Sequence, residues 1–148
     1  MIAAAAVPLL AASNTSRLEA QETVGACSKA AFETVVDDAA EALRNLNAKN
    51  KPAFQEKLRQ LKEKRGWSQD QFLKEATPYV KDDQIEAYEK TSNQHLAKIT
   101  AMGQEGSSSK SPDCTMLSTL HASMLALVET QTAKWTYMFG KLDGELAK

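Results

Sequence analysis

The two cysteines are the residues of this sequence with the most definite chemistry. Cys27 and Cys114 are the only cysteines in the 148 residues, and they lie far apart in the chain. No Cys-x-x-Cys or Cys-x-x-Cys-His motif occurs, so the marks of thioredoxin-like redox chemistry and of c-type haem attachment are missing. Cys and His are too few for a structural zinc site. We therefore expect one structural disulfide; the alternative is two free thiols buried in a helical bundle.

Two histidines lie near methionines at spacings that permit a metal or haem site. His95 precedes Met102 by seven positions, and His121 precedes Met124 by three. Imidazole and thioether groups on facing helices are competent ligands for copper or haem iron. The competing interpretation is core packing, in which a histidine is hydrogen-bonded and methionine fills gaps. A haem- or copper-binding bundle is therefore an alternative, and the leading hypothesis has no cofactor.

Signatures of catalysis are missing from the sequence. It has no Glu-x-x-His pair for a di-iron centre, no His-Glu-x-x-His motif, no phosphate-binding glycine loop and no Gly-x-Ser-x-Gly motif. We therefore expect a protein that is not an enzyme.

Aromatic residues are the best candidates for a ligand or partner contact, because ligand sites in bundles lie between helices. The candidates are Trp67, Tyr79, Tyr88, Trp135 and Tyr137. Core packing is the alternative for each of them. Tyr137 lies off the apolar stripe of its segment, so we expect it to be the most exposed of the five.

The elements that must position these residues are all helices. Apolar residues recur at three- and four-residue spacing, and no segment alternates with the period of a strand. The pattern predicts an all-α, compact helical bundle of about five helices, over residues 27–48, 52–65, 68–77, 82–104 and 112–142. Asn50 and Pro52 separate the first two, Ser68 and Gln71 form a capping box, and Ser111 caps the last. Residues 103–111 have the composition of a mobile linker.

The disulfide limits how these helices are arranged. Both cysteines lie in first helical turns, and a disulfide requires Cα atoms within about 7 Å. The starts of the first and last helices must therefore meet at one end of the molecule. Successive helices alternate in direction when their connections are short, so an even number of reversals separates the two starts. This requirement favours five alternating helices over four, with residues 52–65 and 68–77 forming short ones.

Composition and the N-terminal segment indicate the compartment. Residues 1–20 open with an apolar run that is too short to span a bilayer, which needs about 20 apolar residues. The run resembles the apolar region of a secretory signal, with cleavage after Ala20 or near Ala12, although no basic residue precedes it. The alternative is an Ala-rich tail of a cytosolic protein. We expect residues 21–148 to form one helical domain that is periplasmic or secreted, with no membrane span.

Charge gives no preference for nucleic acid. The formal net charge is −1, so no global field attracts a polyanion. The most basic segment carries Lys57, Arg59, Lys62, Lys64 and Arg65, which either face solvent or form a salt-sensitive contact surface. The leading hypothesis is an exported, non-catalytic binding or accessory protein for a protein partner or a hydrophobic small molecule. A second alternative, beside the haem or copper bundle, is an inhibitor or immunity protein for a cell-envelope enzyme.

Overall fold

The structure is a computed structural model that describes residues 27–110 and 113–148. These residues form helices and no strand, which confirms the all-α prediction. The elements are α1 (Lys29–Arg65), α2 (Gln69–Glu75), α3 (Thr77–Val80), α4 (Asp83–Ser108) and α5 (Cys114–Leu146). The predicted signal segment, residues 1–20, lies outside the described residues.

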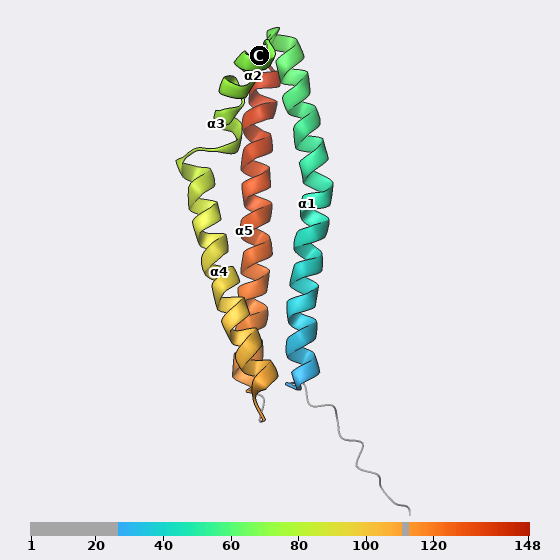
Figure 1. The fold of residues 1–148 in the computed structure, drawn as a ribbon, viewed down its shortest axis with the longest axis vertical. Coiled ribbons are helices and arrows are strands. Elements are labelled where there is room, and N and C mark those ends of the chain that lie inside the picture. The colour runs from blue at the N-terminus through green and yellow to red at the C-terminus, as the bar shows by residue number, and fades with distance from the viewer. Residues whose placement is uncertain (1–26, 111–112) are drawn as a thin grey trace, which may run out of the picture.

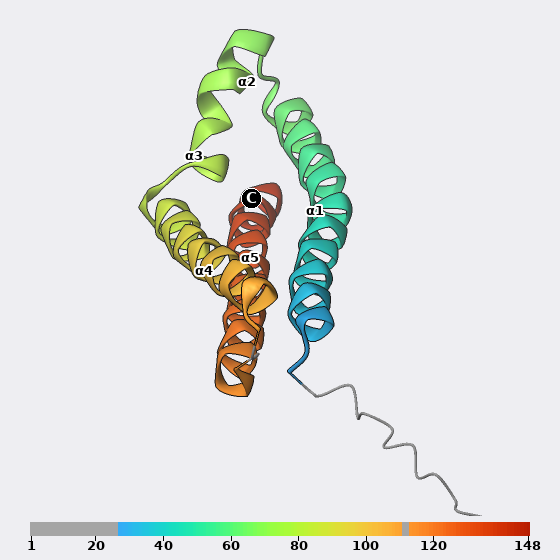
Figure 2. The ribbon, with the colours of Figure 1, turned by 60° about the horizontal axis from the view of Figure 1, so that its bottom comes forward.

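Three long helices form the bundle (Figure 1). Helices α1 and α5 run parallel, and α4 runs antiparallel to both of them. The short helices α2 and α3 carry the chain from the end of α1 to the start of α4, at the end of the bundle away from the described N-terminus (Figure 2). Two reversals therefore separate the starts of α1 and α5. The predicted even number is correct, although only three of the helices are long.

The predicted break between residues 48 and 52 is wrong. Pro52 lies inside α1, a single helix of 37 residues that continues through it to Arg65. A proline in a helix interior removes one backbone hydrogen bond and crowds the carbonyl four residues earlier. The inward-facing side of the helix keeps its register across this point: Leu46, the polar Asn50 and Phe54 follow at four-residue spacing and are all at least half-buried. Packing of that side against the bundle outweighs the local signal for a helix end.

The boundary between the last two long helices also differs from the prediction. Helix α4 continues through residues 103–108, where the sequence predicted a mobile linker. The hydroxyl of Ser108 donates to the Gln104 carbonyl at 2.8 Å, so a serine-rich segment bonds to its own helix here. Asp113 caps α5 by accepting from the Thr115 amide at 2.8 Å, so the predicted cap at Ser111 is wrong. Ser111 and Pro112 lie outside the described residues.

Other helix ends follow the sequence signals. Ser68 accepts from the Gln71 amide, and the Gln71 side chain accepts from the Ser68 amide, which is the predicted capping box. Gly66 ends α1 with φ of 64°, a left-handed conformation that glycine adopts without strain. These two signals place the turn that leads from α1 into α2.

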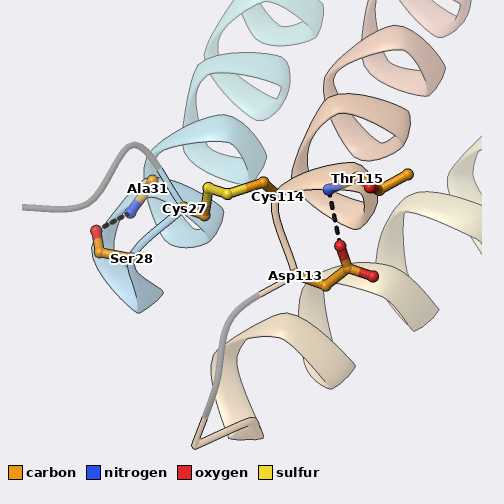
Figure 3. The surroundings of a disulfide bond; sticks show 6 residues. All are labelled: Cys27, Ser28, Ala31, Asp113, Cys114 and Thr115. Atoms are coloured by element: carbon orange, nitrogen blue, oxygen red, sulfur yellow. Dashed lines mark hydrogen bonds between the residues drawn. A yellow bond between two sulfur atoms is a disulfide. The ribbon is translucent and has the colours of Figure 1, made fainter.

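The predicted disulfide joins the starts of α1 and α5 (Figure 3); Cys114 is the first residue of α5, whereas Cys27 lies just before the Ser28 cap of α1 and not in its first turn. Cys27 and Cys114 are 87 positions apart in the chain, and their Cα atoms are 4.9 Å apart. Ser28 caps α1 beside the bond by accepting from the Ala31 amide at 3.2 Å. The bond is compatible with an oxidising extracellular compartment.

The core consists of two apolar clusters. The first, near the disulfide, is built around Phe32, Ala39, Ile99, Leu120, Met124 and Leu127. The second, beneath α2 and α3, is built around Phe54, Leu61, Ile85, Met138 and Leu142. Between them on each helix lie polar residues: the Gln131 side chain donates to Ser92 Oγ at 2.7 Å, and the Trp135 indole donates to Asn47 Oδ1 at 3.2 Å. None of the described helices has the length and apolarity needed to cross a membrane.

Candidate functional site

The histidines and methionines of the metal hypothesis lie in different surroundings. His95 is half-buried on the inner side of α4, and His121 is exposed on α5. Met124 is buried in the first core cluster, and Met102 packs against the same cluster. In residues 27–110 and 113–148, no group of three or more His, Cys, Asp or Glu side chains is placed to hold a metal ion.

Four of the aromatic candidates pack against the second core cluster, namely Trp67, Tyr79, Trp135 and Tyr137. The Trp135 ring meets Phe54 edge-on with centroids 5.8 Å apart. Burial raises the pKa of the Tyr79 hydroxyl. Trp67, Tyr79 and Trp135 therefore serve the core rather than an open site.

Tyr137 also pairs with the fifth candidate, Tyr88, on one face of the molecule. The rings of Tyr88 on α4 and Tyr137 on α5 lie 6.3 Å apart between centroids, at an interplanar angle of 54°. Tyr137 is half-buried, which differs from the expected exposure, because its hydroxyl donates to Asp82 Oδ2 at 2.9 Å. That bond raises the pKa of Tyr137.

Asp82 connects the start of α4 to α5. Its other carboxylate oxygen accepts from the Ile85 amide at 2.8 Å and caps the helix. The Lys141 ammonium also donates to Asp82, and it lies 5.4 Å from the centroid of the Tyr137 ring. The bond from Lys141 is the main cause that lowers the pKa of Asp82 to about 2, with the Ile85 amide next. The aromatic pair is therefore held in place at one end by an ionic network.

Two adjoining hollows lie along α4 and α5 beside this pair, and we call them the α4–α5 face. One has a volume of about 510 Å³ and the other about 380 Å³, and both contain Tyr88, Glu129 and Ala133. Both hollows are open to solvent. The remaining lining comes mostly from small side chains, namely Ala87, Thr91, Thr130, Thr132 and Thr136, with Val128 and Gln84.

The threonines make the α4–α5 face more apolar than its sequence implies. Each of the four donates its hydroxyl to a backbone carbonyl one turn earlier, at 2.7 to 3.0 Å. A hydroxyl used in this way leaves an acceptor oxygen and a methyl group to face a partner. Leu125, one turn before Glu129 on α5, is 53% exposed and extends the apolar surface. Glu129 has no ion-pair partner within the described part of the chain.

The basic segment is largely neutralised within the molecule. Lys57 pairs with Asp143, Arg65 pairs with Glu145 at 2.7 Å, and Lys64 donates to the Leu146 carbonyl at 2.6 Å, so three cations tie α1 to the end of α5. The other two have partners nearby: Arg59 pairs with Glu56 and Glu63, and Lys62 donates to Gln69. Exposed pairs of this kind contribute about 0–1 kcal/mol each. The basic residues therefore join the C-terminal end of α1 to the C-terminal end of α5, and these contacts explain why the segment is rich in Lys and Arg.

Sequence reasoning found the tyrosines of the α4–α5 face but missed the small residues around them. A signal was present, since Glu129 is the only charged residue between Asp113 and Lys134. A long helix that has almost no charged residues on any side has more than one apolar face to bury.

Comparison of the chain with protein-family models, with curated proteins and with solved structures found no significant match.

Proposed function

We propose that the protein is an exported, non-catalytic binding domain that docks a helix of a protein partner on the α4–α5 face. The observation that carries the proposal is the face itself, where methyl groups and two tyrosine rings surround a single carboxylate, that of Glu129. The face has no histidine or cysteine beside that carboxylate, and its four threonine hydroxyls donate to backbone carbonyls rather than to Glu129.

The shape of the face favours a helix over a small molecule. Small-molecule sites bury most of the ligand surface, whereas both hollows here are open grooves along two antiparallel helices. A groove of this kind accommodates the apolar stripe of an amphipathic helix, and small residues such as Ala87 and Ala133 let its backbone approach closely. Glu129 would pair with one Lys or Arg at the edge of that stripe.

Export is supported by two features. The disulfide between Cys27 and Cys114 is stable in an oxidising compartment, and the apolar run in residues 1–20 resembles a secretory signal. The bond restrains the start of α5, which forms one side of the face, and a more rigid surface loses less entropy when a partner binds.

Site-specific photo-cross-linking in cells of the source organism tests the proposal. A photoreactive residue replaces Thr132 on the α4–α5 face, and in a matched protein it replaces Asn45, which is exposed on α1. We expect one discrete protein adduct from position 132 and none from position 45. Adding Thr136→Glu, which places a charge on the face, should abolish the adduct, whereas Asn45→Glu should leave it unchanged.

Three results would contradict the proposal. Equal adducts from positions 132 and 45 would show that the face is not selective. An adduct that persists in the Thr136→Glu protein would place the contact elsewhere. An adduct with the mass of two copies of this chain would assign the face to self-association.

If the adduct contains a cell-envelope enzyme, the activity of that enzyme with and without this protein decides whether the binding is inhibitory.

A further inference from the structure

The two ends of α1 are held against the bundle in different ways. The C-terminal end is joined to α5 by the ion pairs and hydrogen bonds of the basic segment. Among the described residues, the first polar contact along α1 with another helix is at Asn47, which accepts from the Trp135 indole at 3.2 Å. Within that part of the chain, residues 29–46 are therefore held against α4 and α5 by apolar packing and by the Cys27–Cys114 bond alone.

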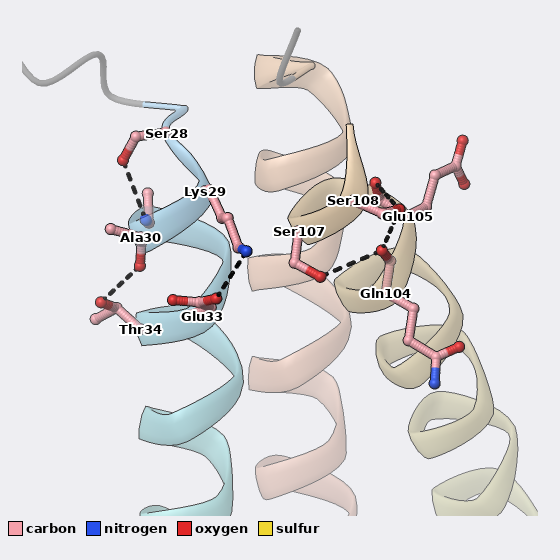
Figure 4. Close-up of polar contacts among 10 residues, drawn as sticks. Ser28, Lys29, Ala30, Glu33, Thr34, Gln104, Glu105, Ser107 and Ser108 are labelled. Atoms are coloured by element: carbon pink, nitrogen blue, oxygen red, sulfur yellow. Dashed lines mark hydrogen bonds and ion pairs between the residues drawn. The ribbon is translucent and has the colours of Figure 1, made fainter. Parts of the chain in front are cut away.

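The polar side chains at the disulfide end form hydrogen bonds within their own helices (Figure 4). On α1, the Thr34 hydroxyl donates to the Ala30 carbonyl at 2.9 Å. On α4, the hydroxyls of Ser107 and Ser108 both donate to the Gln104 carbonyl, at 3.2 and 2.8 Å. No contact drawn in Figure 4 crosses from α1 to α4. These bonds stabilise each helix but do not hold one helix against the other.

Pro52 divides α1 into two parts that pack on different clusters. Its nitrogen carries no hydrogen, so the helix lacks the backbone hydrogen bond to the Ala48 carbonyl. Before Pro52, α1 packs on the first core cluster through Phe32, and after it on the second core cluster through Phe54. An opening of α1 that ends at Pro52 therefore disrupts the first cluster and leaves the second one packed.

The disulfide is accessible to a reductant, because neither of its cysteines is buried. Cys27 is half-buried and Cys114 is exposed. Cys114 is also the first residue of α5, where free backbone N–H groups and the helix dipole stabilise a thiolate. A thiol with a stabilised thiolate is the better leaving group in thiol–disulfide exchange. We therefore expect attack at the Cys27 sulfur, with Cys114 as the group that leaves.

We propose that the Cys27–Cys114 bond is a redox-sensitive latch on residues 29–51, the first part of α1, and that a protein dithiol opens it. A thiolate of the dithiol attacks Cys27 Sγ and forms a mixed disulfide. The Cys27–Cys114 bond breaks, and its electron pair stays on Cys114, which takes up a proton. The second thiol of the reductant then attacks its own sulfur in the mixed disulfide, and Cys27 leaves as a thiolate that is protonated. The reductant ends as a disulfide, and both cysteines end as thiols.

Reduction removes the restraint that opposes opening of residues 29–51. In the oxidised protein an opened segment stays tied at both ends, at Cys27 and beyond Pro52. In the chain-entropy model, holding both ends of a loop of about 25 residues disfavours its opening on the order of 100-fold. Opening exposes Phe32, which is 0% exposed in the closed bundle, and the apolar side chains that it covers. The residues that line the α4–α5 face are not in this segment, so the latch is independent of the partner proposed for that face.

Hydrogen exchange of the full chain, measured by mass spectrometry with and without dithiothreitol, tests the proposal. Dithiothreitol should reduce the bond without denaturant. Peptides from residues 29–46 should then exchange on the order of 100-fold faster. Peptides from residues 54–65 should change by less than about threefold, because a local opening leaves the rest of the structure folded.

The double variant Cys27→Ser, Cys114→Ser is the matched control. Its exchange should equal that of the reduced wild type and should not respond to dithiothreitol, which separates loss of the bond from other effects of the reagent. The proposal is overturned if dithiothreitol reduces the bond only in denaturant, or if exchange of residues 29–46 is unchanged after reduction. It is also overturned if residues 54–65 gain as much exchange as residues 29–46, because reduction would then loosen the whole bundle.

Discussion

Gly106→Ala tests the closest packing in the molecule. An added Cβ would lie 2.1, 2.2 and 2.6 Å from three carbons of the Phe32 ring, including Cγ at its base, so rotation about χ2 cannot relieve the overlap. Displacing the ring forfeits up to the roughly 3–5 kcal/mol that a buried phenylalanine contributes. Alanine regains about 1 kcal/mol of helix propensity. We therefore expect a loss of about 2–4 kcal/mol in the free energy of unfolding.

Urea denaturation of the oxidised protein, followed by circular dichroism and tryptophan fluorescence, measures this loss. Gly140→Ala is the matched control, because nothing lies within 4 Å of a Cβ at that position. The control should stabilise the protein by about 0.5–1 kcal/mol. In a Phe32→Ala background the clash is gone, so Gly106→Ala should no longer destabilise. If Gly106→Ala stabilises as Gly140→Ala does, or still destabilises without the Phe32 ring, the described packing is wrong.

The remaining predictions concern the covalent bond, pH and the proline in α1. Replacing Cys27 and Cys114 together with serine should lower the unfolding free energy by about 4–5 kcal/mol in the chain-entropy model, as measured by urea denaturation, because the bond closes a loop of 87 positions. The pKa of Asp82 is lowered to about 2, so the stability that its carboxylate contributes is complete above pH about 4 and is lost as pH falls towards 2. The melting temperature of Asp82→Asn should therefore fall less between about pH 4 and pH 2 than that of the wild type. Pro52→Ala should raise the unfolding free energy by about 1–3 kcal/mol, because it restores a backbone hydrogen bond in α1, and an unchanged midpoint would show that the helix is already relaxed there.

Much of the fold could be predicted from the sequence, because several independent signals agree. Apolar spacing located α4, α5 and the two halves of α1, and the capping box at Ser68 and the glycine at Gly66 located the turn after α1. A bond between Cys27 and Cys114, at the starts of the first and last helices, required an even number of reversals; the structure has two, where five alternating helices would have four. These features depend on local geometry and on one covalent restraint, so they can be inferred without knowledge of the packing.

The errors arose where packing outweighs a local preference. Pro52 is a strong local signal for a helix end, but α1 packs against the first core cluster before it and against the second core cluster after it. Gly103 and Gly106 contributed to the prediction of a linker, because glycine is common in linkers. In the structure each lies in α4 and allows that helix to approach α1 closely. The sequence shows which residue is small but does not show which ring lies above it.

The candidate surface was less predictable than the fold. Tyr88 and Tyr137 were found from residue type alone, but their pairing depends on how α4 and α5 are aligned. The apolar character of the α4–α5 face depends on threonine hydroxyls that bond to their own helix, and Thr132 and Thr136 are indistinguishable in sequence from solvent-facing threonines. A three-dimensional arrangement was needed to recognise the face.

The state of the two cysteines in the source organism tests the central claim most directly. Cells are treated with a rapid thiol-blocking reagent, and the protein is digested without reduction and analysed by mass spectrometry. A bundle pinned at one end in an oxidising compartment predicts a peptide in which Cys27 is linked to Cys114, with neither cysteine blocked. Recovery of both cysteines in the blocked form would contradict the pinned bundle and the proposed export together.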